Sequence, residues 1–588
     1  MLTFRSALPR EHLSTNVSFS STKRILYVKI CLSPLETNVN TRRDFIQKSL
    51  AGSAALCFSR FPDLGGVSRR GKIEILLQEP QATISPNIYG HFTEHLGGVI
   101  YDGIWVSPES RVSNIGGIRR ELVEHLKKIK APVIRYPGGC FADSYDWRDG
   151  VGPAANRPRR TNFWAGEEND KSTASHKYDP NAFGTDEFMR FCQLAGAQPY
   201  LAANVRSLPA AEFYRWVEYC NSPQGSTTLA ENRGKAGSLA PYNVQYWGVG
   251  NESWGCGGNF TAQEYATEFR RYTAWVPGYQ QQLKFIASGP NGDDLTWTRG
   301  FFEEILRKGE GQLRSIFGFG LHHYAWNTSF GHTTDWNKGK GDALQFDIAG
   351  WYEILREGQR LELMIESHWK TIGEFDPERR VKLVVDEWGP WYRPGSEATP
   401  GDILEQMPTL RDAVFSGMTL DILNRHADKV AMGNCAQLIN CLNSLYLAHE
   451  DKFVITPVGH VFDLYSAHQG AQNIRTVFSA PEVQYDRDGK PATFAPLNGS
   501  ASLRGKDLHL TVVNMSTEYG IDIQVQLRGA SAASASSRVL SALDLHAHNT
   551  FDHRDAVVPY SPNVTISAGQ PSFTFPPASV TALSVRLT

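Results

Sequence analysis

The chain has 588 residues, of which 41% are hydrophobic and 20% are charged, and its formal net charge at pH 7 is −2. A globular chain of this length is expected to fold as two or three domains. The near-neutral charge argues against nucleic acid as the main partner, because proteins that bind nucleic acid usually carry a basic surface.

Residues 1–70 have the character of a leader segment rather than of a folded domain. A twin arginine, Arg42-Arg43, is followed by the short, weakly hydrophobic run Ser49–Phe58, a pattern typical of a twin-arginine export signal. The run is too short to form a permanent membrane span. The segment therefore predicts export to the periplasm or the cell exterior. The alternative is a chance pair of arginines in a leader.

From about Ser85 to Tyr465, short apolar runs alternate with longer amphipathic stretches. A helical pattern at 118–130 precedes a predicted strand at 131–136, and a second one at 185–194 precedes a strand at 198–204. Further strands are predicted at 244–249, 315–322 and 381–385. Repeated β–α units on this scale indicate the α/β class, and we expect residues 85–465 to form a (β/α)8 TIM barrel.

The pattern changes after about Ser466. Residues 508–514, 521–527 and 580–585 are short β-rich runs that mostly alternate apolar and polar side chains, separated by Gly, Ser and Pro. This predicts an additional all-β sandwich domain, jelly-roll-like, over residues 466–588. Residues 71–84 contain the strand-like run Lys72–Leu77, which we expect to pair into the same sandwich.

Two glutamates follow apolar, β-rich runs. One is Glu252 in Gly250-Asn251-Glu252, and the other is Glu387 in Val385-Asp386-Glu387-Trp388-Gly389. Catalytic groups of parallel barrels gather at the carboxyl ends of the strands. Two carboxyl groups at two such ends suit glycosidic bond cleavage, which needs an acid/base and a nucleophile or second base. Taken alone, Gly-Asn-Glu could also be a solvated turn.

The eight cysteines are too few for a disulfide scaffold in a chain of this length and show no CxxC pairs. We therefore expect most of them to be buried thiols, and we expect no zinc site or other metal site. No motif for an organic cofactor was identified. The 14 Trp and 22 Tyr suggest a large core, with sugar-stacking surfaces as the sharper alternative.

Several motifs in a fixed order resemble the α-L-arabinofuranosidases of glycoside hydrolase family fifty-one. Besides the two glutamate motifs, the matching segments are Ile88–Gly98, Ile134–Phe141, Asn181–Thr185, Leu321–Tyr324, Asn424–Asp428 and Cys435–Gln437. The resemblance covers about residues 72–470. It implies a hydrolase that needs no cofactor and acts on arabinose-containing polysaccharides or oligosaccharides.

The resemblance also implies roles for individual residues. Glu252 would be the acid/base and Glu387 the nucleophile of a retaining mechanism. The implied substrate-binding residues are Glu94, Cys140, Asn251, Tyr324 and Gln437. Arg135 and His322 would orient the two carboxylates. Each has a plainer alternative: Cys140 as a packed thiol, Arg135 and His322 as structural ion-pair members, and Gln437 as a core amide.

The leading hypothesis is an exported, exo-acting α-L-arabinofuranosidase that removes terminal arabinofuranose from arabinoxylan, arabinan or their oligosaccharides. The alternatives are a β-xylosidase or β-glucanase on a similar barrel, and a carbohydrate-binding protein that has lost catalysis. The polar stretch Glu167–Pro180 is expected to form a loop on the active face. Similar enzymes are often multimeric, so a homo-oligomer is an open expectation.

Overall fold

The computed structural model describes residues 68–166, 177–399 and 402–588. The twin-arginine segment lies outside these residues, as does most of the polar stretch Glu167–Pro180. Among the described residues, every helix is too short or too polar to cross a membrane.

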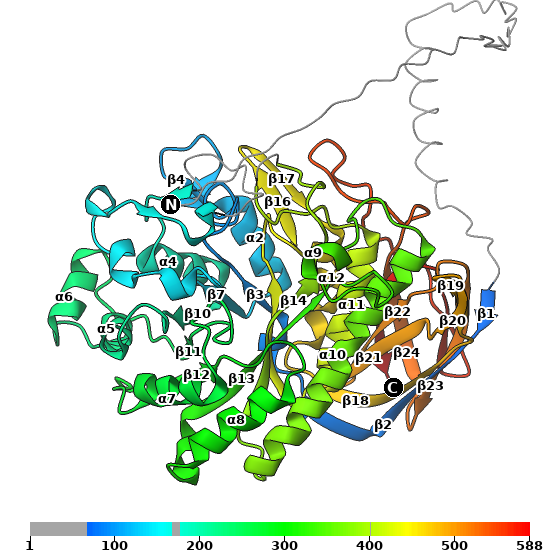
Figure 1. The fold of residues 1–588 in the computed structure, drawn as a ribbon. Helices are drawn as coiled ribbons and strands as arrows, with labels where there is room; N and C mark the ends of the chain where they lie inside the picture. The colour runs from blue at the N-terminus through cyan, green and yellow to red at the C-terminus, as the bar shows by residue number, and fades with distance from the viewer. Residues whose placement is uncertain (1–67, 167–176, 400–401) are drawn as a thin grey trace, which may run out of the picture. The chain divides into compact units, whose positions relative to one another are not determined.

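Eight parallel strands close into a barrel (Figure 1). In chain order they are β3 (Gly90–Phe92), β7 (Val133–Tyr136), β10 (Gln198–Ala203), β11 (Tyr246–Val249), β12 (Lys284–Ala287), β13 (Ile316–Ala325), β14 (Lys382–Pro390) and β15 (Val430–Ala436). Neighbours in sequence are neighbours in the barrel, and β15 closes it against β3. The predicted TIM barrel is confirmed.

Along the chain, each barrel strand is followed by one or more helices. They are α2 (Arg120–Ile129), α4 (Thr185–Ala195), α5 (Ala210–Asn221), α6 (Thr228–Lys235), α7 (Ala262–Thr273), α8 (Leu295–Leu306), α10 (Ile348–Phe375), α11 (Leu410–Arg425) and α12 (Pro457–Tyr465). Local sequence explains where several of them begin. Thr261 caps α7 in a capping box with Glu264, and Thr409 caps α11 with Asp412.

Large side chains fill the barrel interior below the strand ends. Val133, Tyr200, Tyr246, Ile286, Val384 and Met432 form one buried cluster. The interior is therefore a packed core, and the space for a ligand is left at the carboxyl ends of the strands.

The C-terminal part is rich in β-structure and confirms the predicted change of pattern after the barrel. Its strands are β18 (Gln472–Ser479), β19 (Val483–Arg487), β20 (Lys490–Phe494), β21 (Leu497–Arg504), β22 (Asp507–Asn514), β23 (Gly520–Arg528), β24 (Ala532–Leu540), β25 (Thr565–Ser567), β26 (Gln570–Phe575) and β27 (Ser579–Leu587). Most belong to one hydrogen-bonded series, while β19 and β20 form a separate hairpin.

The N-terminal strand β2 (Lys72–Thr83) lies inside this C-terminal sheet, between β18 and β23. It is antiparallel to β18 and parallel to β23. Helix α11 packs on the same sheet, where buried Asp421 accepts hydrogen bonds from Ser500 and Thr511, each at 2.6 Å. These contacts join the barrel to the sheet through both a strand and a helix.

Candidate active site

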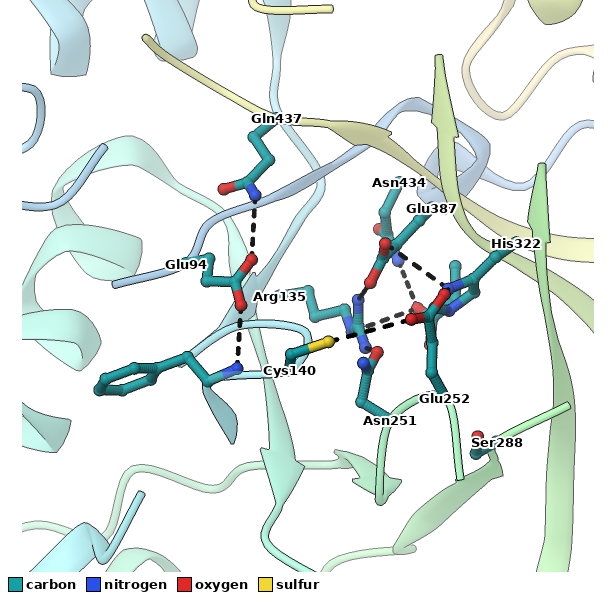
Figure 2. A network of polar contacts seen from close by, with 12 residues as sticks. Glu94, Arg135, Cys140, Asn251, Glu252, Ser288, His322, Glu387, Asn434 and Gln437 are labelled. Atoms are coloured by element: carbon teal, nitrogen blue, oxygen red, sulfur yellow. Dashed lines mark hydrogen bonds and ion pairs between the residues drawn. The ribbon is translucent and has the colours of Figure 1, made fainter. Parts of the chain in front are cut away.

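The two glutamates singled out from the sequence meet at the carboxyl end of the barrel (Figure 2). Glu252 follows the end of β11, and Glu387 lies within β14. Irregular strand pairing flanks β14, with register shifts at Leu321/His322 and between Val385 and Trp388. Such irregularities re-aim side chains. A carboxylate oxygen of Glu252 lies within 4.8 Å of one of Glu387.

Glu387 is held by two strong hydrogen bonds. Arg135 Nη1 donates to its Oε1 over 2.6 Å, and the Tyr324 hydroxyl donates to its Oε2 over 2.7 Å. Burial alone would raise the pKa of Glu387, but the charges of His322 and Arg135 together with these hydrogen bonds lower it below its ordinary value. These contacts therefore favour the ionised form of Glu387.

His322 bridges the two carboxylates. Its Nδ1 lies 3.0 Å from Glu252 Oε1 and 3.5 Å from Glu387 Oε2. Burial would lower the pKa of His322, but the charge of Glu387 and the hydrogen bond with Glu252 raise it above its ordinary value. A protonated imidazole between two carboxyl groups reduces their mutual repulsion and sets their separation.

Arg135 connects Glu387 to Asn251. Its Nη2 donates to Asn251 Oδ1 over 2.6 Å, while its Nη1 contacts Glu387. The guanidinium is almost fully buried and also lies over the ring of Phe92. One planar group thus orients a residue from each of the two glutamate motifs, which only arginine's fixed fork allows.

Glu94 lies across the site from Glu252 and Glu387 (Figure 2). It accepts hydrogen bonds from the Phe141 backbone N–H at 3.0 Å, from Trp164 Nε1 at 3.2 Å and from Gln437 Nε2 at 3.2 Å. Burial raises the pKa of Glu94 to about 7, with the backbone hydrogen bond opposing the rise. A buried carboxyl group of this kind can bind a sugar hydroxyl.

A cavity of about 910 Å³ opens over these side chains. Most of the predicted site residues line it: Glu94, Cys140, Asn251, Glu252, His322, Tyr324, Glu387 and Gln437. Arg135 is not in the lining and lies directly beneath it, in contact with Glu387 and Asn251. The structure therefore brings all nine predicted residues together.

Cys140 requires a correction. Its sulfur forms a disulfide with Cys256, so Cys140 is neither a packed thiol nor a residue with an S–H group to offer a sugar. Sequence spacing could not reveal the pair, because 116 residues separate the two positions. Cys192, Cys220, Cys435 and Cys441 are free and buried, as expected of most cysteines in this chain.

Two buried aspartates of the site were not identified from the sequence. Asp386 accepts hydrogen bonds from Tyr200 and Asn434, each at 2.8 Å, and its Oδ1 lies 3.6 Å from Arg135 Nε. Its position directly before Glu387 was the one available signal. Asp143 accepts from the backbone N–H groups of Val205 at 2.8 Å and Asn251 at 3.0 Å.

Two groups of side chains in the described residues have the spacing of metal ligands. One contains both sulfurs of the disulfide, which leaves no thiolate to bind a metal ion. The other is Glu252, His322 and Glu387, whose polar atoms already contact one another. The donor atoms therefore do not form a dedicated metal site.

Comparison with known proteins identifies the family. The family model described as "Alpha-L-arabinofuranosidase 1 domain" matches residues 125–341, and "Alpha-L-arabinofuranosidase C-terminal domain" matches residues 386–579. The chain is 33% identical to the intracellular exo-α-L-arabinofuranosidase of Bacteroides ovatus over 87% of its own length and 95% of that protein.

Solved structures agree. The family 51 arabinofuranosidase from Xanthomonas axonopodis pv. citri has a TM-score of 0.80 and 34% identity, covering 88% of this chain and 100% of that one. The arabinose complex of the α-L-arabinofuranosidase from Thermotoga maritima has a TM-score of 0.74 and 30% identity, with the same coverage. The chain therefore belongs to the α-L-arabinofuranosidases of glycoside hydrolase family 51.

Proposed function

We propose that this glycoside hydrolase is an exo-acting α-L-arabinofuranosidase that works by double displacement with retention of configuration. The observation that carries the proposal is the spacing of the two carboxylates, whose oxygens lie within 4.8 Å. Retaining glycosidases place their carboxyl groups about 5–5.5 Å apart, whereas inverting ones need roughly 6.5–9.5 Å to admit a water molecule.

In the first step, ionised Glu387 attacks the anomeric carbon while Glu252 protonates the departing oxygen. A covalent arabinofuranosyl ester forms on Glu387. Glu252, now ionised, then takes a proton from water, which hydrolyses the ester. The more exposed position of Glu252, 22% against 7% for Glu387, supports this assignment, since the acid/base must meet both the leaving group and incoming water.

The remaining residues have binding and positioning roles in this proposal. Glu94 and Gln437 hold furanose hydroxyls from one side, and Asn251 holds the 2-hydroxyl, where hydrogen bonds strengthen in the transition state. Tyr324 keeps its hydroxyl on Glu387 near the ring oxygen. Arg135 and His322 act through the carboxylates they contact. Cys140 contributes a disulfide surface to the sugar pocket.

The cavity is larger than a single sugar requires, and its lining includes Trp254, Trp326, Trp336 and Trp391. Aromatic faces pack against the apolar C–H faces of sugar rings. We therefore assign the outer part to the remainder of an arabinoxylan or arabinan chain, or of an oligosaccharide derived from it.

Hydrolysis of p-nitrophenyl α-L-arabinofuranoside, β-D-xylopyranoside and β-D-glucopyranoside tests the substrate class. The expected result is a strong preference for the arabinofuranoside and release of the retained anomer, followed by NMR. Glu387→Ala should abolish turnover and leave arabinose binding in place. Preference for a pyranoside, or first release of the inverted anomer, would contradict the proposal.

Export is a further proposal and rests on the twin arginine at Arg42-Arg43 and the run Ser49–Phe58. Changing both arginines to lysine should keep the protein in the cytoplasm of the host, as followed by cell fractionation. Equal distribution of the wild-type chain and the variant would refute export by this route. A homo-oligomer is likewise proposed from the family resemblance, and light scattering of the purified protein tests it.

A further inference from the structure

The loop that carries Glu252 has an unfavourable backbone conformation. Glu252 has φ of +38° and Gly250 has φ of +80°. Glycine adopts positive φ freely, but a glutamate there costs on the order of 1–3 kcal/mol. Such a conformation persists only where surrounding contacts hold it.

Besides the side-chain contacts of Asn251 and Glu252 described above, two backbone hydrogen bonds and a disulfide hold this loop to its surroundings. The Asn251 N–H donates to Asp143 Oδ2 at 3.0 Å, and the Ser253 N–H donates to Ser288 Oγ at 3.1 Å. The third attachment is the disulfide, which joins Cys256 to Cys140. The two hydrogen bonds hold the residues on either side of Glu252. The disulfide holds the far side of the turn and is covalent.

The disulfide also touches the Glu252 carboxyl group itself. Cys256 Sγ lies 3.6 Å and Cys140 Sγ 3.9 Å from Glu252 Oε2, while His322 Nδ1 lies 3.0 Å from Oε1. One carboxyl oxygen is therefore held by an imidazole, and the other packs on two sulfurs (Figure 2, which labels Cys140). A disulfide has no S–H group to donate, so this side fixes the carboxyl group by packing.

We propose that the Cys140–Cys256 disulfide is a positioning element for Glu252, and that full activity on substrates with poor leaving groups requires it. The proposal rests on the acid/base role of Glu252 proposed above. A loop freed at Cys256 can relax from the conformation imposed on Glu252, and a displacement of about 1 Å can cost on the order of a hundredfold in rate. The nucleophile Glu387 has its own contacts, to Arg135 and Tyr324.

The disulfide is also reachable from the substrate side. Cys140 lines the cavity and both half-cystines are only partly buried. A dithiol reductant can enter and transfer two electrons and two protons: the S–S bond breaks, two thiols form, and the reductant becomes a disulfide. Bound arabinose would cover this route. Such a bond persists in oxidising compartments, which agrees with the proposed export.

The test compares leaving groups in Cys256→Ala, which opens the disulfide and leaves Cys140 in place in the sugar pocket. The kcat/KM for an arabinoxylo-oligosaccharide should fall on the order of a hundredfold, because its sugar leaving group needs protonation. The kcat/KM for p-nitrophenyl α-L-arabinofuranoside should stay within about threefold, because nitrophenolate leaves without a proton. Azide should raise kcat on the aryl substrate and yield arabinofuranosyl azide, because azide can replace water in the attack on the ester and, unlike water, needs no general base.

Two controls accompany the variant. Cys220→Ala removes a buried free thiol remote from the cavity and should behave as wild type on both substrates. Dithiothreitol treatment of the folded wild-type chain should reproduce the same leaving-group split, a large loss on the oligosaccharide and a small loss on the aryl substrate, without any mutation. A high arabinose concentration should slow the reduction. Peptide mapping without reductant should recover Cys140 and Cys256 in one linked fragment.

Several results would overturn the proposal: unlinked peptides, equal losses on both substrates without azide rescue, or full activity of Cys256→Ala on both substrates. A reduction rate indifferent to arabinose would refute access through the cavity. Glu252→Ala separates this proposal from the proposed function. If that variant lacks the split, the acid/base assignment is wrong; if it shows the split and the cysteine variant does not, only the role of the disulfide fails.

Discussion

Replacing Arg135 with lysine tests whether one guanidinium positions both halves of the site. Arg135 Nη1 and Nη2 each donate at 2.6 Å, to Glu387 and Asn251 respectively, and its side chain is 1% exposed. Lysine keeps the positive charge, which limits the loss of stability expected when a buried carboxylate loses its partner. Its single ammonium cannot reproduce both fork-like contacts.

The size of the effect follows from the hydrogen bond that lysine cannot make. A hydrogen bond to a charged group contributes about 1.5–3 kcal/mol. Since about 1.4 kcal/mol corresponds to a factor of ten in rate, loss of one such bond predicts a fall in kcat/KM of roughly 10- to 150-fold. If the lysine keeps Glu387 and releases Asn251, the loss concerns binding of the sugar. If it keeps Asn251, the nucleophile itself is less well held.

The pH profile distinguishes these cases. The pKa of Glu387 is below its ordinary value, so its ionised form is present down to low pH, and its protonation lowers the rate only when the pH drops through that pKa. Weaker contact with a cation raises the pKa, so the acid limb of kcat/KM in Arg135→Lys should move to higher pH if the lysine releases Glu387 and stay in place if it releases Asn251. The same contact should contribute stability above the unfolded pKa that is lost on acidification.

The assay is kcat/KM for p-nitrophenyl α-L-arabinofuranoside from pH 4 to 8, with circular dichroism to confirm folding. Tyr324→Phe is the matched comparison, because it removes one hydrogen bond to Glu387 and no charge. Wild-type kcat/KM with an unmoved acid limb in Arg135→Lys would refute the reasoning.

Three further predictions concern the buried or partly buried ionisable groups of Glu94, Lys340 and Asp421. Burial raises the pKa of Glu94 to about 7 and its protein partners all donate to it, so KM should rise as pH falls through about 7; Glu94→Gln should have a high KM that is flat with pH, and a flat wild-type profile would count against this role. Lys340 lies 4.1 Å from the Trp336 ring and 4.2 Å from the Trp391 ring, where burial lowers its pKa to about 8. Lys340→Met should remove about 0.5–2 kcal/mol of cation–π energy that holds the Trp336 and Trp391 rings, which line the cavity. KM for arabinoxylo-oligosaccharides should therefore rise several-fold, with kcat on the aryl substrate unchanged; an unchanged oligosaccharide KM would contradict this prediction. Asp421→Asn should lower the free energy of unfolding by about 2 kcal/mol, measured in urea, because Asp421 accepts bonds that join α11 to the sheet; burial raises its pKa to about 7, so the wild-type advantage should shrink as pH rises through that value, and equal stability at pH 5 would refute it.

Local patterns were enough to predict much of the fold. The alternation of helical and strand-like runs predicted α2 before β7 and α4 before β10, and the structure places these elements within a few residues of the predicted bounds. Strand β14 runs further than expected, through Glu387 to Pro390. Hydrophobic periodicity is a local property, so it identifies elements well and their ends less well.

The site residues were found through motifs rather than through geometry. Asn251-Glu252 and Asp386-Glu387 stand out in the sequence because each follows an apolar run. Glu94, Tyr324 and Gln437 could be named only from resemblance to a family, since nothing local distinguishes them from structural polar residues. No role was predicted for Asp143, because its partners, the backbone N–H groups of Val205 and Asn251, are distant in sequence.

The sequence by itself determined many of the strands and helices and singled out two carboxyl groups, one just after β11 and one in the last part of β14. Tertiary structure alone decided what those groups touch: Arg135 meets Glu387 across 252 positions, Gln437 meets Glu94 across 343, and Cys140 meets Cys256 across 116. The physical reason is barrel closure. It brings the carboxyl ends of distant strands together at one face, where charges, hydrogen bonds and sulfurs combine in ways that no local pattern encodes.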